Sequence, residues 1–137
     1  MHSLPSASLV VEVPFFDVDA MHVVWHGHYV KYLELARCEL LRKFNYDYPD
    51  MEASGYVWPI VDMHIKYVGS ARMTDKIRIE ANLLEYENRL KIAYLIRDEA
   101  TGKKLTKAST IQVAVCKQSG EMQFASPQVL LDKLAAL

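Results

Sequence analysis

Four stretches between residues 61 and 116 place apolar side chains at alternate positions, and this pattern constrains the fold more than any other feature. A period of two is typical of β-strands that bury one face. The predicted strands span residues 61–67, 77–83, 90–96 and 105–116. In the last of them, Ile111, Val113 and Val115 are expected to form the apolar face. Turn-forming pairs at 87–88 and 101–102 separate the later strands, so the pattern predicts an antiparallel sheet with one apolar face to cover.

Residues 27–44 are predicted to form the helix that supplies this cover. The apolar face of the helix consists of residues spaced three and four apart, with Leu35 among those that widen it. The spaced residues are Tyr29, Leu33, Ala36, Leu40 and Phe44. A first strand is expected at 8–16, turns at 45–50 and a short helix at 127–136. Segregated helix and strands predict an α+β fold, a curved antiparallel sheet wrapped around one long central helix.

Length and charge narrow the function classes. The chain has 137 residues, which fits a single domain over 1–137, and its net charge of −1 lacks the basic excess of a nucleic-acid-binding domain. The N-terminus has no basic region followed by a long apolar run, as a signal peptide would have. No apolar run approaches 18 residues, so no membrane insertion is expected. We therefore expect a cytoplasmic protein.

The residues capable of chemistry cluster between the first strand and the long helix. Asp17 and Asp19 precede a loop with His22, His26 and His28. An aspartate in such a loop is commonly a turn former or a helix cap. The three histidines have the ligand type of a metal site, although packing around a site is the more common role. From residue types alone, the aspartates can be turn formers, helix caps or catalytic groups, and the histidines can bind a metal or pack around a site.

The same stretch carries a family resemblance. The strings FDVDA (16–20), VVWH (23–26) and YVKYLELAR (29–37) fit D-x-D-x-x-x-V-V-[YW]-[HY]-x-x-Y followed by a helix with an Ala-Arg step. The pattern resembles the hotdog-fold acyl-CoA thioesterases. It is most similar to the 4-hydroxybenzoyl-CoA thioesterase branch, which includes bacterial relatives associated with the Tol-Pal system. The resemblance implies a hotdog fold and hydrolysis of an acyl-CoA thioester to a free acid and coenzyme A.

The resemblance also implies roles for particular residues. Asp19 would be the catalytic carboxylate, acting as general base or nucleophile, and the backbone N–H of His26 would polarise the thioester carbonyl. No metal and no cofactor are expected. The sites of this family lie at subunit contacts, which implies a homodimer or a homotetramer. Glu34 is the fallback carboxylate, because some hotdog enzymes place theirs on the helix.

Substrate contacts are expected from three places. Trp25, Tyr29 and His22 lie near the predicted site, and Arg89 and Lys91 match part of a basic cluster that binds coenzyme A in the 4-hydroxybenzoyl-CoA enzyme. The chain departs from its relatives at Met21-His22, where they often have glycine. Glycine permits loop dihedral angles that other residues disfavour. The loop geometry is therefore expected to differ here.

Three other functions remain open from the sequence. One is a hotdog hydratase or dehydratase with a differently placed pair of histidine and carboxylate. Another is a metal-dependent hydrolase that uses His22, His26 and His28. The third is a non-catalytic protein that binds acyl-CoA or acyl-carrier thioesters.

Overall fold

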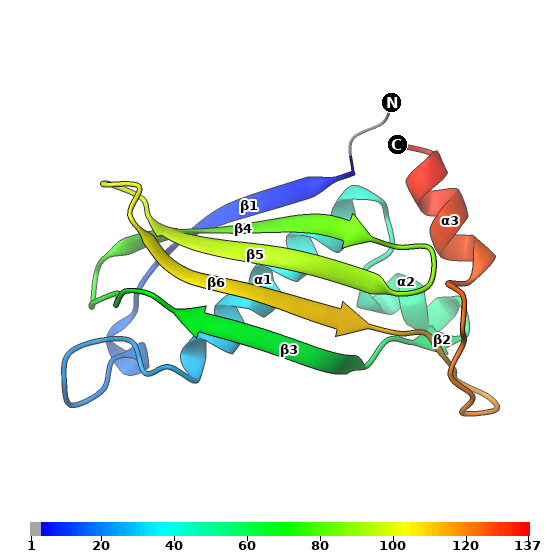
Figure 1. Ribbon diagram of the computed structural model, residues 1–137, viewed down its shortest axis with the longest axis horizontal. Coiled ribbons are helices and arrows are strands. Elements are labelled where there is room, and N and C mark those ends of the chain that lie inside the picture. The colour runs from blue at the N-terminus through cyan, green and yellow to red at the C-terminus, as the bar shows by residue number, and fades with distance from the viewer. Residues whose placement is uncertain (1–3) are drawn as a thin grey trace.

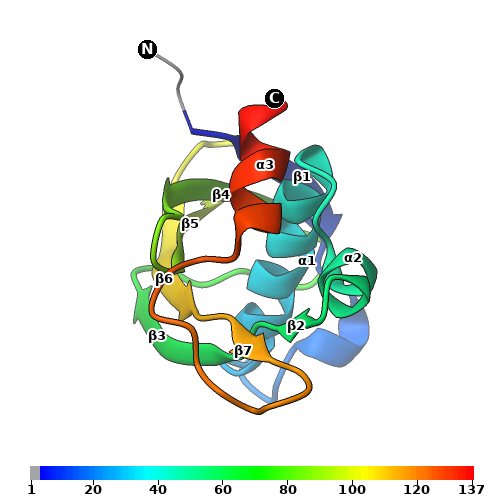
Figure 2. The same cartoon turned by 90° about the vertical axis from the view of Figure 1, so that its right-hand side faces the viewer.

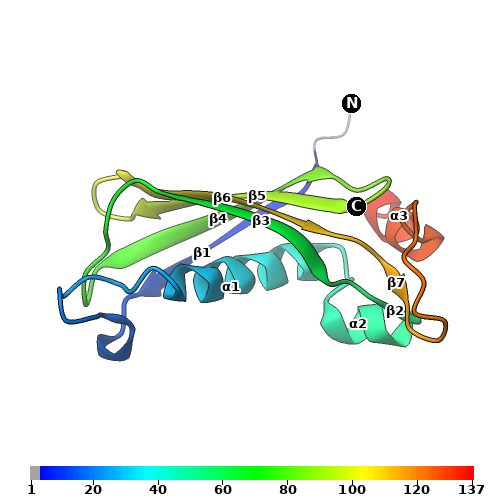
Figure 3. The same cartoon turned by 60° about the horizontal axis from the view of Figure 1, so that its bottom comes forward.

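The computed structural model describes residues 4–137, and its main body is a curved antiparallel sheet with one long helix against it (Figure 1). In spatial order the five strands are β1 (Ser6–Glu12), β4 (Lys76–Glu85), β5 (Leu90–Asp98), β6 (Lys104–Gln112) and β3 (Ile60–Tyr67). Helix α1 (His28–Lys43) lies across the concave face of the sheet (Figure 3). The predicted α+β architecture is confirmed.

Smaller elements close one end of the molecule. Strands β2 (Tyr56–Val57) and β7 (Val115–Cys116) pair with each other, next to α2 (Tyr48–Ala53). Helix α3 (Gln128–Ala135) lies over the same end (Figure 2). The Ser126 N–H, just before α3, donates to the Glu87 carbonyl in the β4–β5 hairpin. Within residues 4–137, no helix is both long and apolar enough to cross a membrane.

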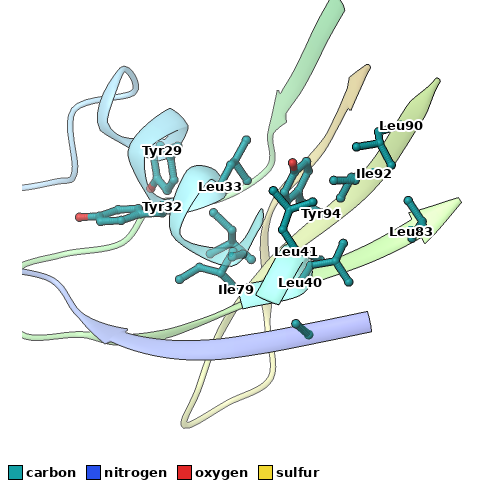
Figure 4. Close-up of a cluster of buried hydrophobic side chains, with 14 of the residues drawn as sticks. Tyr29, Tyr32, Leu33, Leu40, Leu41, Ile79, Leu83, Leu90, Ile92 and Tyr94 are labelled. Atoms are coloured by element: carbon teal, nitrogen blue, oxygen red, sulfur yellow. The ribbon is translucent and has the colours of Figure 1, made fainter. Parts of the chain in front are cut away.

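The predicted apolar face of α1 forms the centre of the core (Figure 4). Its five residues are each no more than 2% exposed, and they pack with the inward side chains of β4 and β5. Burial of each of the leucine and phenylalanine side chains in this set stabilises the fold by about 1.5–3 kcal/mol. Leu35, expected to widen this face, is instead 43% exposed, because it lies on the side of α1 that faces away from the sheet.

The fourth predicted strand buries the opposite face from the one expected. Thr110 and Gln112 are 1% and 0% exposed, whereas Ile111 between them is only half-buried. Hydrogen bonds make the polar burial tolerable, because Thr110 is bonded to the Tyr94 hydroxyl at 2.9 Å and Gln112 Nε2 donates to the Trp58 carbonyl at 2.8 Å. The strand also ends at Gln112, and only Val115–Cys116 of its predicted continuation is extended.

Three boundaries differ from the sequence-based prediction. The first strand ends at Glu12, and Pro14 precedes a short 3-10 helix, η1 (Phe15–Asp17). The segment 45–50 contains the start of α2, because Asp47 and Asp50 form a capping box rather than a simple turn. Helix α1 begins at His28, one residue later than predicted.

Candidate active site

The loop between β1 and α1 is folded into a small hairpin at the end of the molecule opposite α3 (Figure 1). Val18 and Val24 form a β-bridge, and the Asp19 N–H donates to the Val23 carbonyl at 2.9 Å. A second bridge joins Val23 to Arg72 in the β3–β4 connection. The loop is therefore held from both sides in a defined conformation.

The tip of this hairpin contains the departure from the relatives noted in the sequence. His22 has a φ of +65°, in the left-handed region that glycine adopts most readily. Histidine is among the residues enriched there, but a non-glycine residue in this region still carries about 1–3 kcal/mol of strain. The loop thus keeps a glycine-like backbone without a glycine.

Asp19 is half-buried at this tip, and one of its oxygens shapes the turn. Asp19 Oδ1 accepts a hydrogen bond from the Met21 N–H at 2.8 Å. The backbone carbonyl of Asp19 accepts another from the His22 N–H at 2.9 Å. Among residues 4–137, Asp19 Oδ2 accepts no hydrogen bond. Turn formation, one of the roles left open by the sequence, is therefore present, and one carboxylate oxygen remains for chemistry.

Asp17 has a very different environment. It is 1% exposed, and three side chains of the first turns of α1 surround it. Lys31 Nζ lies 2.6 Å from Oδ1, the Tyr32 hydroxyl donates to Oδ2 at 2.5 Å, and His28 Nδ1 lies 3.8 Å from Oδ1. Burial alone would raise the pKa of Asp17, but the bonds from Lys31 and Tyr32 outweigh it and hold this pKa below its usual value. With both oxygens occupied, Asp17 is not arranged to act as a base.

The start of α1 supplies unpaired backbone donors. Gly27 is the N-cap, no side chain caps the helix, and its first turn has no acidic residue. In the described part of the chain, the N–H groups of His26 and Gly27 donate to no acceptor. The His26 carbonyl accepts from the Tyr67 hydroxyl at 2.8 Å, which ties this segment to the end of β3. Free N–H groups and the positive end of a helix dipole are suited to bind a developing oxyanion.

The predicted aromatic contacts separate into a surface residue and a core residue. Trp25 is 48% exposed and its ring lies 4.9 Å from the ring of His26. Tyr29 is 2% exposed, packs against Tyr67 and accepts a hydrogen bond from the Ala71 N–H at 3.3 Å. In this single chain, Trp25 therefore lies at the surface beside His26, whereas Tyr29 supports the loops around it.

The histidines of this loop are not assembled into a metal site. His22 and His26 are exposed, and His28 is directed at Asp17. No group of three histidine, cysteine, aspartate or glutamate side chains within residues 4–137 is arranged to hold a metal ion.

Arg89 and Lys91 belong to the β4–β5 hairpin, which lies at the opposite end of the chain from the loop 13–27 (Figures 1 and 3). Arg89 Nε pairs there with Glu85 at 3.2 Å. The structure of one chain therefore does not bring these two basic residues together with Asp19.

Glu34, the fallback carboxylate, is 57% exposed on α1 and lies 3.4 Å from Arg37. Arg37 is almost fully buried and also donates to the hydroxyls of Tyr48 and Tyr94. This group forms a polar link between α1, α2 and the sheet. The pairing of Glu34 with Arg37, three residues apart on one helix, is a structural contact.

Comparison with known proteins assigns the fold to a family. Residues 13–134 match the model of the thioesterase-like superfamily. The chain belongs to this superfamily. Its sheet and central helix have the hotdog arrangement, as predicted, and membership confirms the prediction of a thioesterase-type enzyme.

Named relatives point the same way. The chain is 27% identical to the putative acyl-CoA thioesterase YneP of Bacillus subtilis over 110 residues, which covers 80% of this chain and 79% of the relative. It is 30% identical to the acyl-CoA thioesterase YbgC of Haemophilus influenzae, over 70% of this chain and 76% of that one. Among solved structures, a DHNA-CoA thioesterase from Staphylococcus aureus superposes with a TM-score of 0.78 at 25% identity, covering 85% of this chain and 78% of the other.

Proposed function

We propose that this protein hydrolyses acyl-CoA thioesters, with Asp19 and the start of α1 as its catalytic parts. The observation that carries the proposal is that the loop of residues 13–27 holds both parts. Among the described residues, Asp19 Oδ2 and the N–H groups of His26 and Gly27 form no hydrogen bond. The printed names of the relatives support the substrate class. The narrower assignment to the 4-hydroxybenzoyl-CoA branch, with its Tol-Pal-associated members, remains part of this proposal.

The chemistry follows from these groups. The thioester carbonyl oxygen accepts from the His26 N–H, and each such donor contributes about 3–4 kcal/mol to the transition state. Water attacks the carbonyl carbon as Asp19 accepts one of its protons. The C–S bond then breaks, its electron pair leaves with sulfur, and the proton held by Asp19 passes to that sulfur, so the products are the free thiol and the carboxylic acid. Direct attack by Asp19 would instead form a mixed anhydride that water hydrolyses.

A panel of aromatic, short-chain and long-chain acyl-CoAs tests this function, with free thiol as the readout. We expect the natural chain to hydrolyse at least one class, and Asp19→Asn to lower kcat by about 100-fold or more. The Asp19→Asn variant keeps an acceptor for the Met21 N–H, so the turn should persist. An inactive natural chain, or an Asn variant that is equally fast, would disprove the proposal.

We also propose that two chains pair through β3, which is an edge strand of the sheet. Val61 and Tyr67 on this strand are 55% and 45% exposed, so pairing with a second strand would also bury apolar surface. Antiparallel pairing centred on His64 would place Asp62 opposite the partner subunit's Lys66. It would thereby relieve the pair of like charges that Lys66 forms with Lys107 across β3 and β6.

This pairing would also complete the site. The Ile60 end of one β3 would lie beside the Tyr67 end of the other, and the Tyr67 hydroxyl binds the segment that precedes α1. The β4–β5 hairpin lies at the Ile60 end (Figure 1). Arg89 and Lys91 of the partner subunit would then approach the loop 13–27, where they could meet the phosphates of coenzyme A.

A charge exchange tests the pairing. Lys66→Asp would place two acidic residues opposite each other, so we expect the dimer to weaken when its mass is followed by light scattering. Adding Asp62→Lys should restore it, because the charges are then exchanged rather than matched. A single variant that dimerises as well as the natural chain would rule out this register.

A further inference from the structure

The most strongly held carboxylate in the described chain is not the one proposed for catalysis. Asp17 is buried, and each of its oxygens accepts from a different side chain of α1, Lys31 at 2.6 Å and Tyr32 at 2.5 Å. Lys31 is itself 47% exposed on its side chain, so the pair spans from the surface into the interior. Such charge-assisted bonds are about twice as strong as neutral ones. Nothing in the proposed chemistry uses this group directly.

The backbone of Asp17 is hydrogen-bonded as well as its side chain. Its N–H donates to the Pro14 carbonyl at 3.1 Å, and its carbonyl accepts from the Trp25 N–H at 3.0 Å. Trp25 directly precedes His26, whose N–H is a proposed donor to the substrate. Asp17 therefore joins both branches of the hairpin to the first turns of α1.

From this double attachment we propose that Asp17 is a positioning residue, which with Lys31 and Tyr32 sets Asp19 against the donors at the start of α1. The inference rests on the proposed function and extends it to a residue that touches no substrate. A small displacement of a catalytic group can cost about 100-fold in rate, so a clamp of this kind has a large effect on the reaction.

The pair also keeps the charge near Asp19 balanced. The Cα atoms of Asp17 and Asp19 lie at most about 7 Å apart, because two residues span no more than that. At such a separation an unpaired charge still acts on a neighbouring carboxylate. Pairing with Lys31 removes the repulsion that Asp17 would otherwise exert on the ionised Asp19.

Asp17→Asn tests the clamp and the charge balance together. We expect kcat to fall by about 10- to 100-fold while KM changes less than about threefold, because positioning is lost and substrate contacts are kept. In the double variant Asp17→Asn with Lys31→Met, the unpaired Lys31 charge is also removed, and kcat should not fall much further than in Asp17→Asn alone.

Conservative variants separate positioning from general stability. Lys31→Arg keeps a charged donor and should retain most of the activity, whereas Lys31→Met should lower kcat. Tyr32→Phe, which removes only the hydroxyl, should lower kcat less than Asp17→Asn does. Arg42→Met is the matched control, because it removes ion pairs of an exposed side chain, with Glu39 and Asp47, from the other end of the same helix. Circular dichroism and thermal melts would verify that each variant is folded.

The outcomes distinguish the two proposals. A folded Asp17→Asn variant with unchanged kcat would overturn the positioning role, even if Asp19→Asn is inactive. A variant that raises KM as much as it lowers kcat, or a Lys31→Arg variant as slow as Lys31→Met, would also overturn it. If Asp19→Asn retains full activity, the proposed mechanism is itself wrong, whatever the Asp17 variants show.

Discussion

The two ends of α1 are finished in opposite ways. At its C-terminus, Arg42 and Lys43 complement the helix dipole, and Asn45 takes the left-handed conformation that ends many helices, with a φ of +55°. At its N-terminus, Gly27 provides no side-chain cap and the first turn has no acidic residue. A side-chain cap would add about 1 kcal/mol of stability there.

The C-terminal end of α1 is arranged for stability, whereas in the proposed mechanism the N-terminal end is kept open for the substrate. The C-terminal end is completed by groups within the chain. At the N-terminal end, the N–H groups of His26 and Gly27 donate to no acceptor among residues 4–137. In the proposed mechanism, a substrate oxygen takes the place of a cap there. The helix has no side-chain cap at this end. Asp17, which lies outside the helix, instead holds its first turns through bonds from Lys31 and Tyr32.

Removing one ion pair at each end of α1 should show the largest contrast in the free energy of unfolding. We expect Asp17→Asn to lower the free energy of unfolding at pH 7 by about 1–3 kcal/mol, since it removes hydrogen bonds to a buried charge. Glu39→Gln at the other end should cost less than about 0.5 kcal/mol, because its pair with Arg42 is exposed. Urea unfolding of both variants at pH 7 measures the contrast.

The Asp17 contribution should also depend on pH in a defined direction. Its pKa is lower in the folded chain than the value of about 3.9 expected in the unfolded chain, so the stabilisation is present above that value and lost as pH falls through the folded pKa. The difference in unfolding free energy between the natural chain and Asp17→Asn should therefore shrink from pH 7 to pH 3. A difference that grows on acidification would contradict the assigned ionisation.

Adding a methyl group at the open end should have the next largest effect. A Cβ at Gly27 would lie 2.1 Å from an atom of the Trp25 ring, so Gly27→Ala must displace that ring. We expect kcat/KM to fall by about tenfold, because the ring lies beside the open N–H groups. Steady-state kinetics measures the loss, and tryptophan fluorescence reports the ring movement.

A second substitution serves as the control for that experiment. In a Trp25→Ala background the added methyl group has room, so Gly27→Ala should then have little further effect on kcat/KM. Equal losses in both backgrounds would mean that the methyl group acts on the backbone rather than through Trp25.

The smallest effect is expected at the tip of the loop. His22→Gly removes the strain of a φ of +65°, but it also gives the unfolded chain more freedom. The net result should be a stabilisation of up to about 1 kcal/mol in urea unfolding. His22→Ala is the comparison, because alanine has the same difficulty with this dihedral angle. A glycine variant less stable than the alanine variant would show that the strain is not relieved.

Local spacing predicted much of the fold and less of the site. The period of two located β3, β4 and β5, and the spacing of three and four located α1, because these rules depend only on near neighbours in the chain. The same rules located β6 but assigned the wrong face of it to the core. Thr110 and Gln112 are buried there and form hydrogen bonds with Tyr94 and Trp58. Those partners lie far away in the sequence, so no local pattern could reveal them.

Asp17 illustrates the same limit within the site. Lys31 and Glu34 are three residues apart on the helix, a spacing that allows an ion pair, but Lys31 binds Asp17, fourteen residues earlier in the chain. Glu34 pairs with Arg37 instead. A loop must fold back before Asp17 and Lys31 can meet, and the sequence carries no periodic signal for that event.

The sequence by itself determined the long helix, the main strands and the α+β class, because these follow from short-range periodicity. It also contained the family motif, and the two candidate groups, Asp19 and the His26 N–H, follow from the resemblance that this motif carries. Only the tertiary structure decided which aspartate is buried, which face of β6 points inward and which basic residues lie far from the loop. The physical reason is that burial and pairing depend on what the folded chain brings together across long separations, where a charge is stable in the interior only beside its partner.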